Sequence, residues 1–254
     1  MKLRVLGCSG GIGGNLRTTS FLLDHDILID AGTGLGDLSL AEMCLIDHVF
    51  VTHSHLDHIA CLPLLIDSVG FMRDKPLCIH ATAETLCILQ KHIFNWEIWP
   101  DFAEIPNLHQ PVMCYEKVKL GETVSLGGRS FTPLPVSHVV PAVGYHVDSG
   151  KGSLVFSGDT TSCDEFWTAV NGIKRLKYLI VEAAFSDAER DLAVLSKHLC
   201  PSLLAEELNK LKLQPEIFIT HLKPGEVELT MLEIGERVQR FVPKMLQNGQ
   251  TFEF

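Results

Sequence analysis

Short apolar runs alternate with amphipathic segments along the whole chain. The run Val49-Phe50-Val51, β-branched and aromatic, is typical of a buried strand, and residues 57–70 directly after it repeat apolar positions at helical spacing. The same two patterns recur to the end of the chain. Strands are predicted at residues 3–7, 20–23, 27–30, 48–52, 77–80, 115–120, 130–136, 142–147, 153–156, 178–182, 216–220 and 251–254. Helices are predicted at residues 57–70, 82–94, 164–171, 196–213 and 226–241.

This interleaving of strands and helices predicts an α/β fold whose sheets are covered by helices. A chain of 254 residues fits one large hydrophobic core, so we expect a single domain over residues 1–254. Residues 94–111 are the least regular part, rich in proline and tryptophan. A lid, a dimer contact and a passive surface loop all remain open for that segment.

Composition narrows the class of protein. A hydrophobic share of 46% and a charged share of 20% are ordinary for a globular domain. The eight cysteines are scattered without a Cys-x-x-Cys pair, which indicates small buried thiols in a reducing compartment. No secretory leader and no apolar run of about 18 residues is present, so a cytoplasmic protein without membrane contact is expected. The net charge of −10 disfavours a long nucleic acid as partner and favours a small substrate.

The candidate chemistry begins with the segment His53-Ser54-His55-Leu56-Asp57-His58, which holds four metal-binding side chains in six residues. It lies between the predicted strand and the predicted helix. Side chains two apart on an extended segment point the same way, so His53 and His55 can bind one ion. Asp57 and His58 lie where the chain has begun to turn, and they can face a second ion. Imidazole and carboxylate donors suit zinc, and manganese or iron also accept them. A histidine-rich surface turn is the alternative that this setting disfavours.

Three further candidates each follow an apolar run: His138, Asp159 and His221. Such strand ends are where α/β proteins place their sites. Coordination chemistry then predicts two divalent cations, zinc with manganese also accepted. Ion one takes His53, His55 and His138; ion two takes Asp57, His58 and His221; the two oxygens of Asp159 bridge both. Each ion keeps an open position, as in a catalytic site. A water between two such cations loses a proton near neutral pH and becomes a nucleophile.

The whole motif set resembles the metallo-β-lactamase superfamily: His53-x-His55-x-Asp57-His58, His138, Ser157-Gly158-Asp159 and His221, with Leu6-Gly7-Cys8-Ser9-Gly10 and Leu28-Ile29-Asp30-Ala31-Gly32 before them. That resemblance implies a four-layer αββα sandwich over nearly the entire chain. Within the superfamily, the opening motif is similar to the signature of class II cyclic-nucleotide phosphodiesterases. The segments His198-Leu199-Cys200-Pro201 and Thr220-His221-Leu222-Lys223-Pro224-Gly225 are similar to later motifs of the same enzymes.

The resemblance implies hydrolysis of a 3′,5′-cyclic nucleotide to the 5′-monophosphate. Glu182 and His198 occupy places that resemble an acid pair in the transfer-RNA-processing phosphodiesterases, so His198 is expected to protonate the leaving oxygen. A surface carboxylate and a helix-capping histidine are the alternative reading of that pair. Asp57 is a further catalytic candidate. Lys223 is a candidate for phosphate binding, and Asn15 and Thr160 lie near the expected opening in sequence.

Other members of the superfamily remain as alternatives. Ribonuclease Z-like enzymes carry a long basic arm between the third histidine and the aspartate, whereas residues 139–158 here are short and hold one lysine. A lactonase shares the ligand set. Redox relatives place glutamate at the position of His55 and add a flavin domain, and non-catalytic relatives lose ligands. Relatives often form dimers, so the resemblance leaves a homodimer open.

Overall fold

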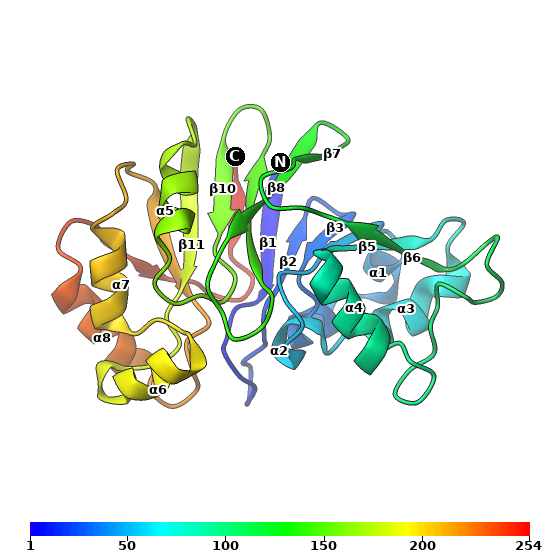
Figure 1. Cartoon of the computed structure of the whole chain (residues 1–254), viewed down its shortest axis with the longest axis horizontal. Coiled ribbons are helices and arrows are strands. Elements are labelled where there is room, and N and C mark those ends of the chain that lie inside the picture. Colours follow the sequence, from blue (N-terminus) through cyan, green and yellow to red (C-terminus); the bar gives the residue numbers. More distant parts are fainter.

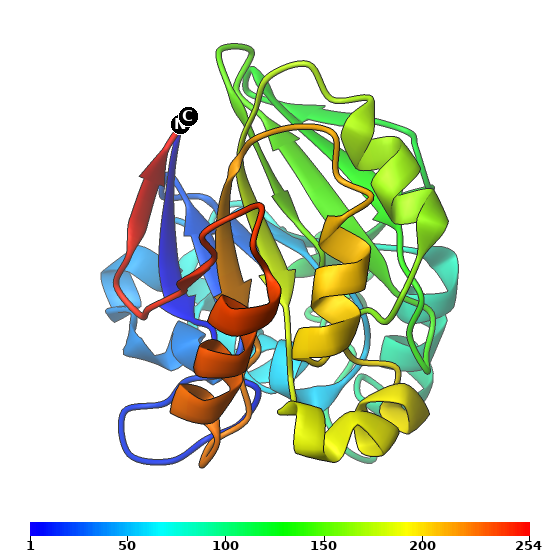
Figure 2. The same cartoon turned by 90° about the vertical axis from the view of Figure 1, so that its left-hand side faces the viewer.

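Two mixed seven-stranded sheets pack face to face, and helices cover both outer faces. The computed structural model describes residues 1–254 and shows these four layers side by side (Figures 1 and 2). The four-layer αββα prediction is therefore confirmed. The first sheet runs in the order β14 (Thr251–Glu253), β1 (Lys2–Gly7), β2 (Ser20–Leu23), β3 (Ile27–Ile29), β4 (His48–Phe50), β5 (Leu77–Ala81), β6 (Met113–Lys117). The second runs β13 (Lys244–Met245), β12 (Glu216–Thr220), β11 (Leu176–Glu182), β10 (Ser153–Phe156), β9 (Val143–Asp148), β8 (Arg129–Pro135), β7 (Val124–Leu126).

Three apolar clusters correspond to the three interfaces between these layers. The cluster between the sheets includes Phe50 and Phe131, whose rings stack with centroids 4.2 Å apart. One outer cluster lies under α1 (Leu40–Met43), α2 (Leu56–Ile59), α3 (Leu62–Val69) and α4 (Ala83–His92). The other lies under α5 (Asp164–Asn171), α6 (Arg190–Ser196), α7 (Pro201–Leu208) and α8 (Val227–Arg237). None of the helices is both long and apolar enough to cross a bilayer.

The strand directions bring five chain segments to one end of the sandwich. Strands β3 to β6 are parallel to one another, and β10 to β13 are likewise parallel. The carboxyl ends of β4, β10, β11 and β12, together with the end of β8, therefore lead into the same region, as α/β architecture dictates. The metal-binding candidates stand within three residues of the ends of β4, β8, β10 and β12 or in the turn that follows β4.

Helix lengths differ from the pattern-based predictions in two places. The helix expected at 57–70 is two helices, α2 and α3, because Pro63 supplies no N–H to continue the first one and instead stands in the first turn of the second. The helix expected at 196–213 is only α7, because Lys197 adopts a left-handed conformation with φ 54° that ends α6. Helix α6 was not predicted, since its apolar residues mostly face outward.

The irregular segment 94–111 packs on the first sheet's outer cluster. Phe94 and Phe102 are buried there, while Trp96, Ile98 and Leu108 are exposed. Short strands β7 and β13 and helix α1 also went unpredicted, because two to four residues carry too little periodicity to register.

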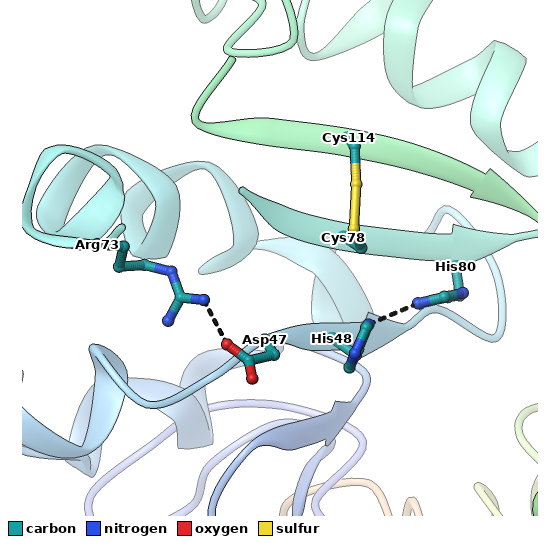
Figure 3. Close-up of a disulfide and its surroundings, with 6 residues drawn as sticks. All are labelled: Asp47, His48, Arg73, Cys78, His80 and Cys114. Atoms are coloured by element: carbon teal, nitrogen blue, oxygen red, sulfur yellow. Dashed lines mark hydrogen bonds and ion pairs between the residues drawn. A yellow bond between two sulfur atoms is a disulfide. The ribbon is translucent and has the colours of Figure 1, made fainter. Parts of the chain in front are cut away.

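The expectation that all eight cysteines are thiols is wrong for two of them. Cys78 on β5 and Cys114 on β6 stand directly opposite each other in parallel register and form a disulfide, and the other six cysteines are free. Figure 3 shows this bond beside the paired imidazoles of His48 and His80, whose nearest nitrogens are 3.0 Å apart. Arg73 pairs with Asp47 at the start of β4 in the same view.

Candidate metal centre

The strand-to-helix turn after β4 presents the first four candidate ligands. His53 lies three residues past the end of β4 and is fully buried, and His55 is the N-cap of α2. Asp57 and His58 lie within that helix, and the His58 ring stands 4.2 Å from the His53 ring. Asp57 keeps 27% of its side chain exposed, so the centre opens to solvent on its side.

The first ligand group predicted from the sequence assembles in the structure. One donor atom from each of four side chains lies within 4.8 Å of the others: His53, His55, His138 and Asp159. The Nδ1 of His55 and the Nε2 of His138 are 3.2 Å apart. Two nitrogens on a tetrahedral zinc ion with ordinary bond lengths stand about 3.3 Å apart, so these two donors already have the spacing that one ion requires.

The second group assembles in the same way, with donor atoms within 4.8 Å of one another: Asp57, His58, Asp159 and His221. The Nε2 of His58 is 4.0 Å from the nearer carboxylate oxygen of Asp57, and the Nε2 of His221 is 3.6 Å from that same oxygen. His58 and His221 are fully buried with their rings stacked, so this group is rigidly packed except on the side of Asp57.

Asp159 belongs to both groups through different oxygens. Its Oδ2 lies 3.5 Å from His53 Nε2 and 3.9 Å from His138 Nε2. Its Oδ1 lies 3.3 Å from His58 Nε2 and 3.3 Å from His221 Nδ1. Gly158 before it has φ 61°, and an added Cβ would come within 3.0 Å of the Val143 carbonyl, so a side chain there would disturb the turn that positions the carboxylate.

Hydrogen bonds behind the ligands fix which imidazole nitrogen faces the centre. His58 donates from Nδ1 to Asp30 at 2.7 Å, and His138 donates from Nδ1 to the Lys197 carbonyl at 3.0 Å. The Thr52 hydroxyl donates to the same Asp30 oxygen at 2.8 Å and accepts from His53 Nδ1 at 3.0 Å. The Nε2 atoms of all three histidines are thereby left as lone-pair donors toward the centre.

These supporting groups, Asp30, Thr52 and Lys197, were not assigned a role from the sequence. Asp30 lies inside the Leu28–Gly32 motif, and Thr52 precedes the first ligand, so position beside a motif was the only available signal. Lys197 could not be found in this way, because it contributes a backbone carbonyl.

Burial keeps most of the candidate ligands neutral. It lowers the pKa of His53 well below the ordinary value and lowers the pKa of His138 to about 4 and that of His221 to about 3. Neutral imidazole is the form that binds metal. For His58, burial also disfavours the charge, but the Asp159 and Asp30 carboxylates outweigh it and hold the pKa well above normal. The carboxylates of Asp30 and Asp159 thus favour positive charge at His58, which is the charge that a divalent cation would supply.

An independent observation also indicates that this set of donor atoms fits metal ions. Among the buried side-chain nitrogens without a hydrogen-bond partner in the protein, four belong to candidate ligands: His53 Nε2, His58 Nε2, His221 Nδ1 and His221 Nε2. Leaving buried polar atoms unpaired costs about 1–3 kcal/mol each, so such a concentration indicates partners of another kind. All four lie in the two ligand groups, and a pair of divalent ions would satisfy the three that face Asp159.

Glu182 and His198 form a pair beside this centre. Glu182, at the end of β11 and fully buried, accepts a hydrogen bond of 2.7 Å from His198 Nδ1 and further bonds from the backbone N–H groups of Thr160 and Leu199. Burial lowers the pKa of His198, but the charge and hydrogen bond of Glu182 more than compensate, so that the pKa is raised. The His198 ring lies 5.0 Å from that of His138 and 5.2 Å from that of His221.

The three residues that the sequence suggested for substrate binding have other contacts or positions in the structure. Lys223 donates its amine to the Gly10 carbonyl at 2.7 Å, and Thr160 is buried, with its backbone N–H bound to Glu182. Asn15 lines a cavity of about 480 Å³ together with Leu16, Leu222 and Asn248. No ligand contact of these three follows from their positions.

Comparison with known proteins gives consistent results. The model of the Beta-lactamase superfamily domain matches residues 25–239. A probable 3′,5′-cyclic-nucleotide phosphodiesterase of Yersinia pestis is 26% identical over 96% of this chain and 82% of its own length. A ribonuclease Z of Pyrobaculum islandicum is 28% identical over 74% of each chain. The crystal structure of unliganded yeast PDE1 superposes with a TM-score of 0.80 at 20% identity and covers 98% of both chains.

Proposed function

The chain belongs to the beta-lactamase superfamily, and from this premise we propose that residues 1–254 act as a dinuclear-metal phosphodiesterase that hydrolyses 3′,5′-cyclic nucleotides to 5′-monophosphates. The observation that carries the proposal is the buried Glu182–His198 pair, which stands beside two ligand groups that share Asp159. The Yersinia relative's description as a cyclic-nucleotide phosphodiesterase supports the choice of substrate class.

The proposed ligands are the seven predicted from the sequence. One ion would be held by His53, His55 and His138, the other by Asp57, His58 and His221, and Asp159 would contact both. Zinc fits the nitrogen-rich donor set best, and manganese is the alternative. Bound there, the ions supply positive charge for the phosphate oxygens and lower the pKa of water.

The protein's own side chains carry the proton transfers. A departing ribose 3′ oxygen is a strongly basic alkoxide, so it needs an acid. His198, with Nδ1 bound to Glu182, leaves its Nε2 for the substrate, and its raised pKa favours the protonated form that an acid requires. Asp57 is the partly exposed carboxylate of the centre, and we assign it the orientation of the attacking water by accepting one of its protons.

RNA 3′ processing is the second candidate, favoured by the ribonuclease Z relative. Against it, the segment between His138 and Asp159 is filled by β9 and β10, which leaves a short connection where those enzymes carry a basic arm. A lactonase would not need the Glu182–His198 acid pair in the same way.

A hydrolysis screen tests the proposal. Purified protein loaded with zinc or with manganese is incubated with cyclic AMP, cyclic GMP, a bis-aryl phosphodiester, a lactone and a precursor transfer RNA. We expect 5′-monophosphate from a cyclic nucleotide, identified by chromatography against the 3′ isomer, and no turnover after chelation. Turnover of the lactone or the RNA without turnover of either cyclic nucleotide would refute the proposal.

A further inference from the structure

Four large apolar side chains are exposed on segments that carry or contact the metal-binding candidates. Leu56 is 66% exposed, Val139 50%, Leu195 78% and Ile12 69%. Isolated exposed apolar residues are common, whereas several around one site indicate a binding surface. We name these four residues the apolar rim.

Two members of the rim adjoin metal-binding candidates in the chain. Leu56 follows His55 and is the first residue of α2, and Val139 follows His138. Because their neighbours point into the centre, both exposed side chains stand at its margin.

The other two members reach the margin through contacts. Leu195 lies in the last turn of α6, and the helix ends at Lys197, whose carbonyl accepts from His138 Nδ1 and whose amine donates to the His138 carbonyl at 3.1 Å. Ile12 lies in the loop between β1 and β2. In that loop Gly10 approaches the His221 backbone so closely that an added Cβ would come within 2.3 Å of its carbonyl oxygen.

The figures show at which end of the molecule these segments lie. Helices α2 and α6, the β1–β2 loop and the β8–β9 turn are all found in the lower half of the sandwich in Figures 1 and 2. This is the end at which the strands deliver the ligands.

The charges at the opening do not suit a polyanion. Lys197 and Lys223 come from the segments that form the opening, yet both amines already donate to backbone carbonyls of the protein. A nucleic-acid surface needs several cations free to contact phosphates. Apolar side chains instead gain free energy by covering an apolar or aromatic group.

We propose that the apolar rim binds the aromatic substituent of a small phosphodiester whose phosphate is held at the metal centre. This inference rests on the proposed function and makes it more specific: the nucleobase of a cyclic nucleotide, or an aryl group, lies on Leu56, Val139, Leu195 and Ile12. The rim residues act in binding, and they take no part in bond cleavage.

Binding of two anions that lack a hydrolysable ester bond tests the proposal on the metal-loaded protein without turnover. Diphenylphosphinate and dimethylphosphinate carry the same charged group and differ only in their substituents. Calorimetric titration should give a Kd for diphenylphosphinate at least tenfold lower than for dimethylphosphinate. Leu195→Gln and Val139→Thr should each weaken diphenylphosphinate binding by about three- to fivefold and leave dimethylphosphinate binding unchanged, which is the usual size of a lost apolar contact.

The control variant is Leu108→Gln, because Leu108 is 75% exposed in the distant segment 94–111. It should bind both anions as the unmodified protein does. Equal affinities for the two anions, or equal losses for both in the rim variants, would overturn the proposal. A dimer in light scattering that Leu195→Gln converts to monomer would also overturn it, because a second copy would then cover the rim. Anion selectivity without cyclic-nucleotide turnover would leave the rim established and refute only the proposed activity.

Discussion

Replacing His198 by alanine tests whether this residue acts as a general acid or as part of the metal centre. His198 is outside the two main ligand groups and is held by Glu182, so the variant should retain its metal content. Loss of a positioned general acid lowers kcat by about 10²- to 10⁴-fold when the leaving group is a basic alkoxide. The same variant should hydrolyse bis(4-nitrophenyl) phosphate almost normally, because nitrophenolate departs as a stable anion without a proton.

The companion variant Glu182→Gln tests whether the carboxylate behind His198 sets the pKa of this acid. The His198 Nδ1 and Glu182 Oε1 atoms are 2.7 Å apart and the pair is almost wholly buried. Burial lowers the pKa of His198, but the charge and hydrogen bond of Glu182 outweigh it and raise that pKa. A general acid works only while protonated, so kcat falls as pH rises through its pKa. Glu182→Gln removes the charge that raises this pKa, so it should move that fall to lower pH.

The assay follows kcat against pH for cyclic AMP and for bis(4-nitrophenyl) phosphate, with bound metal measured by mass spectrometry. Equal losses on both substrates, or loss of metal from His198→Ala, would show that His198 serves the centre itself. A pH profile that Glu182→Gln leaves in place would remove the carboxylate from the proposed acid pair.

Two further changes test the centre and the core. Asp159→Ala should reduce bound metal from two ions per chain to fewer than one by mass spectrometry, since its two oxygens face both ligand groups; retention of two ions would disprove the bridge. Burial and the neighbouring His48 lower the pKa of His80 to about 4, so folded His80 stays neutral while the unfolded chain takes up a proton below about pH 6.5. Stability should therefore be lost as pH falls from 6.5 to 4, by about 3 kcal/mol from this residue. His80→Phe should remove that part of the slope in urea titrations, and an unchanged slope would contradict the assignment.

The apolar runs predicted an α/β fold with helix-covered sheets and the approximate course of most strands, and the resemblance to the metallo-β-lactamase superfamily implied the four layers. The sequence also placed the seven candidate ligands just past strand ends or in the turn after β4, and parallel strands bring such ends together. What it missed depends on contacts between distant segments. The Asp30–His58 bond joins residues 28 apart, and the Cys78–Cys114 disulfide depends on the register of β5 against β6. Helix α6 has Leu192, Val194 and Leu195 exposed, so no apolar face marked it.

The bond between Cys78 and Cys114 closes a covalent ring that contains α4 and the whole of segment 94–111. A protease that cuts at the exposed Leu108 would therefore break the backbone without dividing the molecule. The two pieces would migrate as one band on a denaturing gel and separate only after a reductant is added. An intact band on a non-reducing gel therefore does not show that the backbone between Cys78 and Cys114 is uncut.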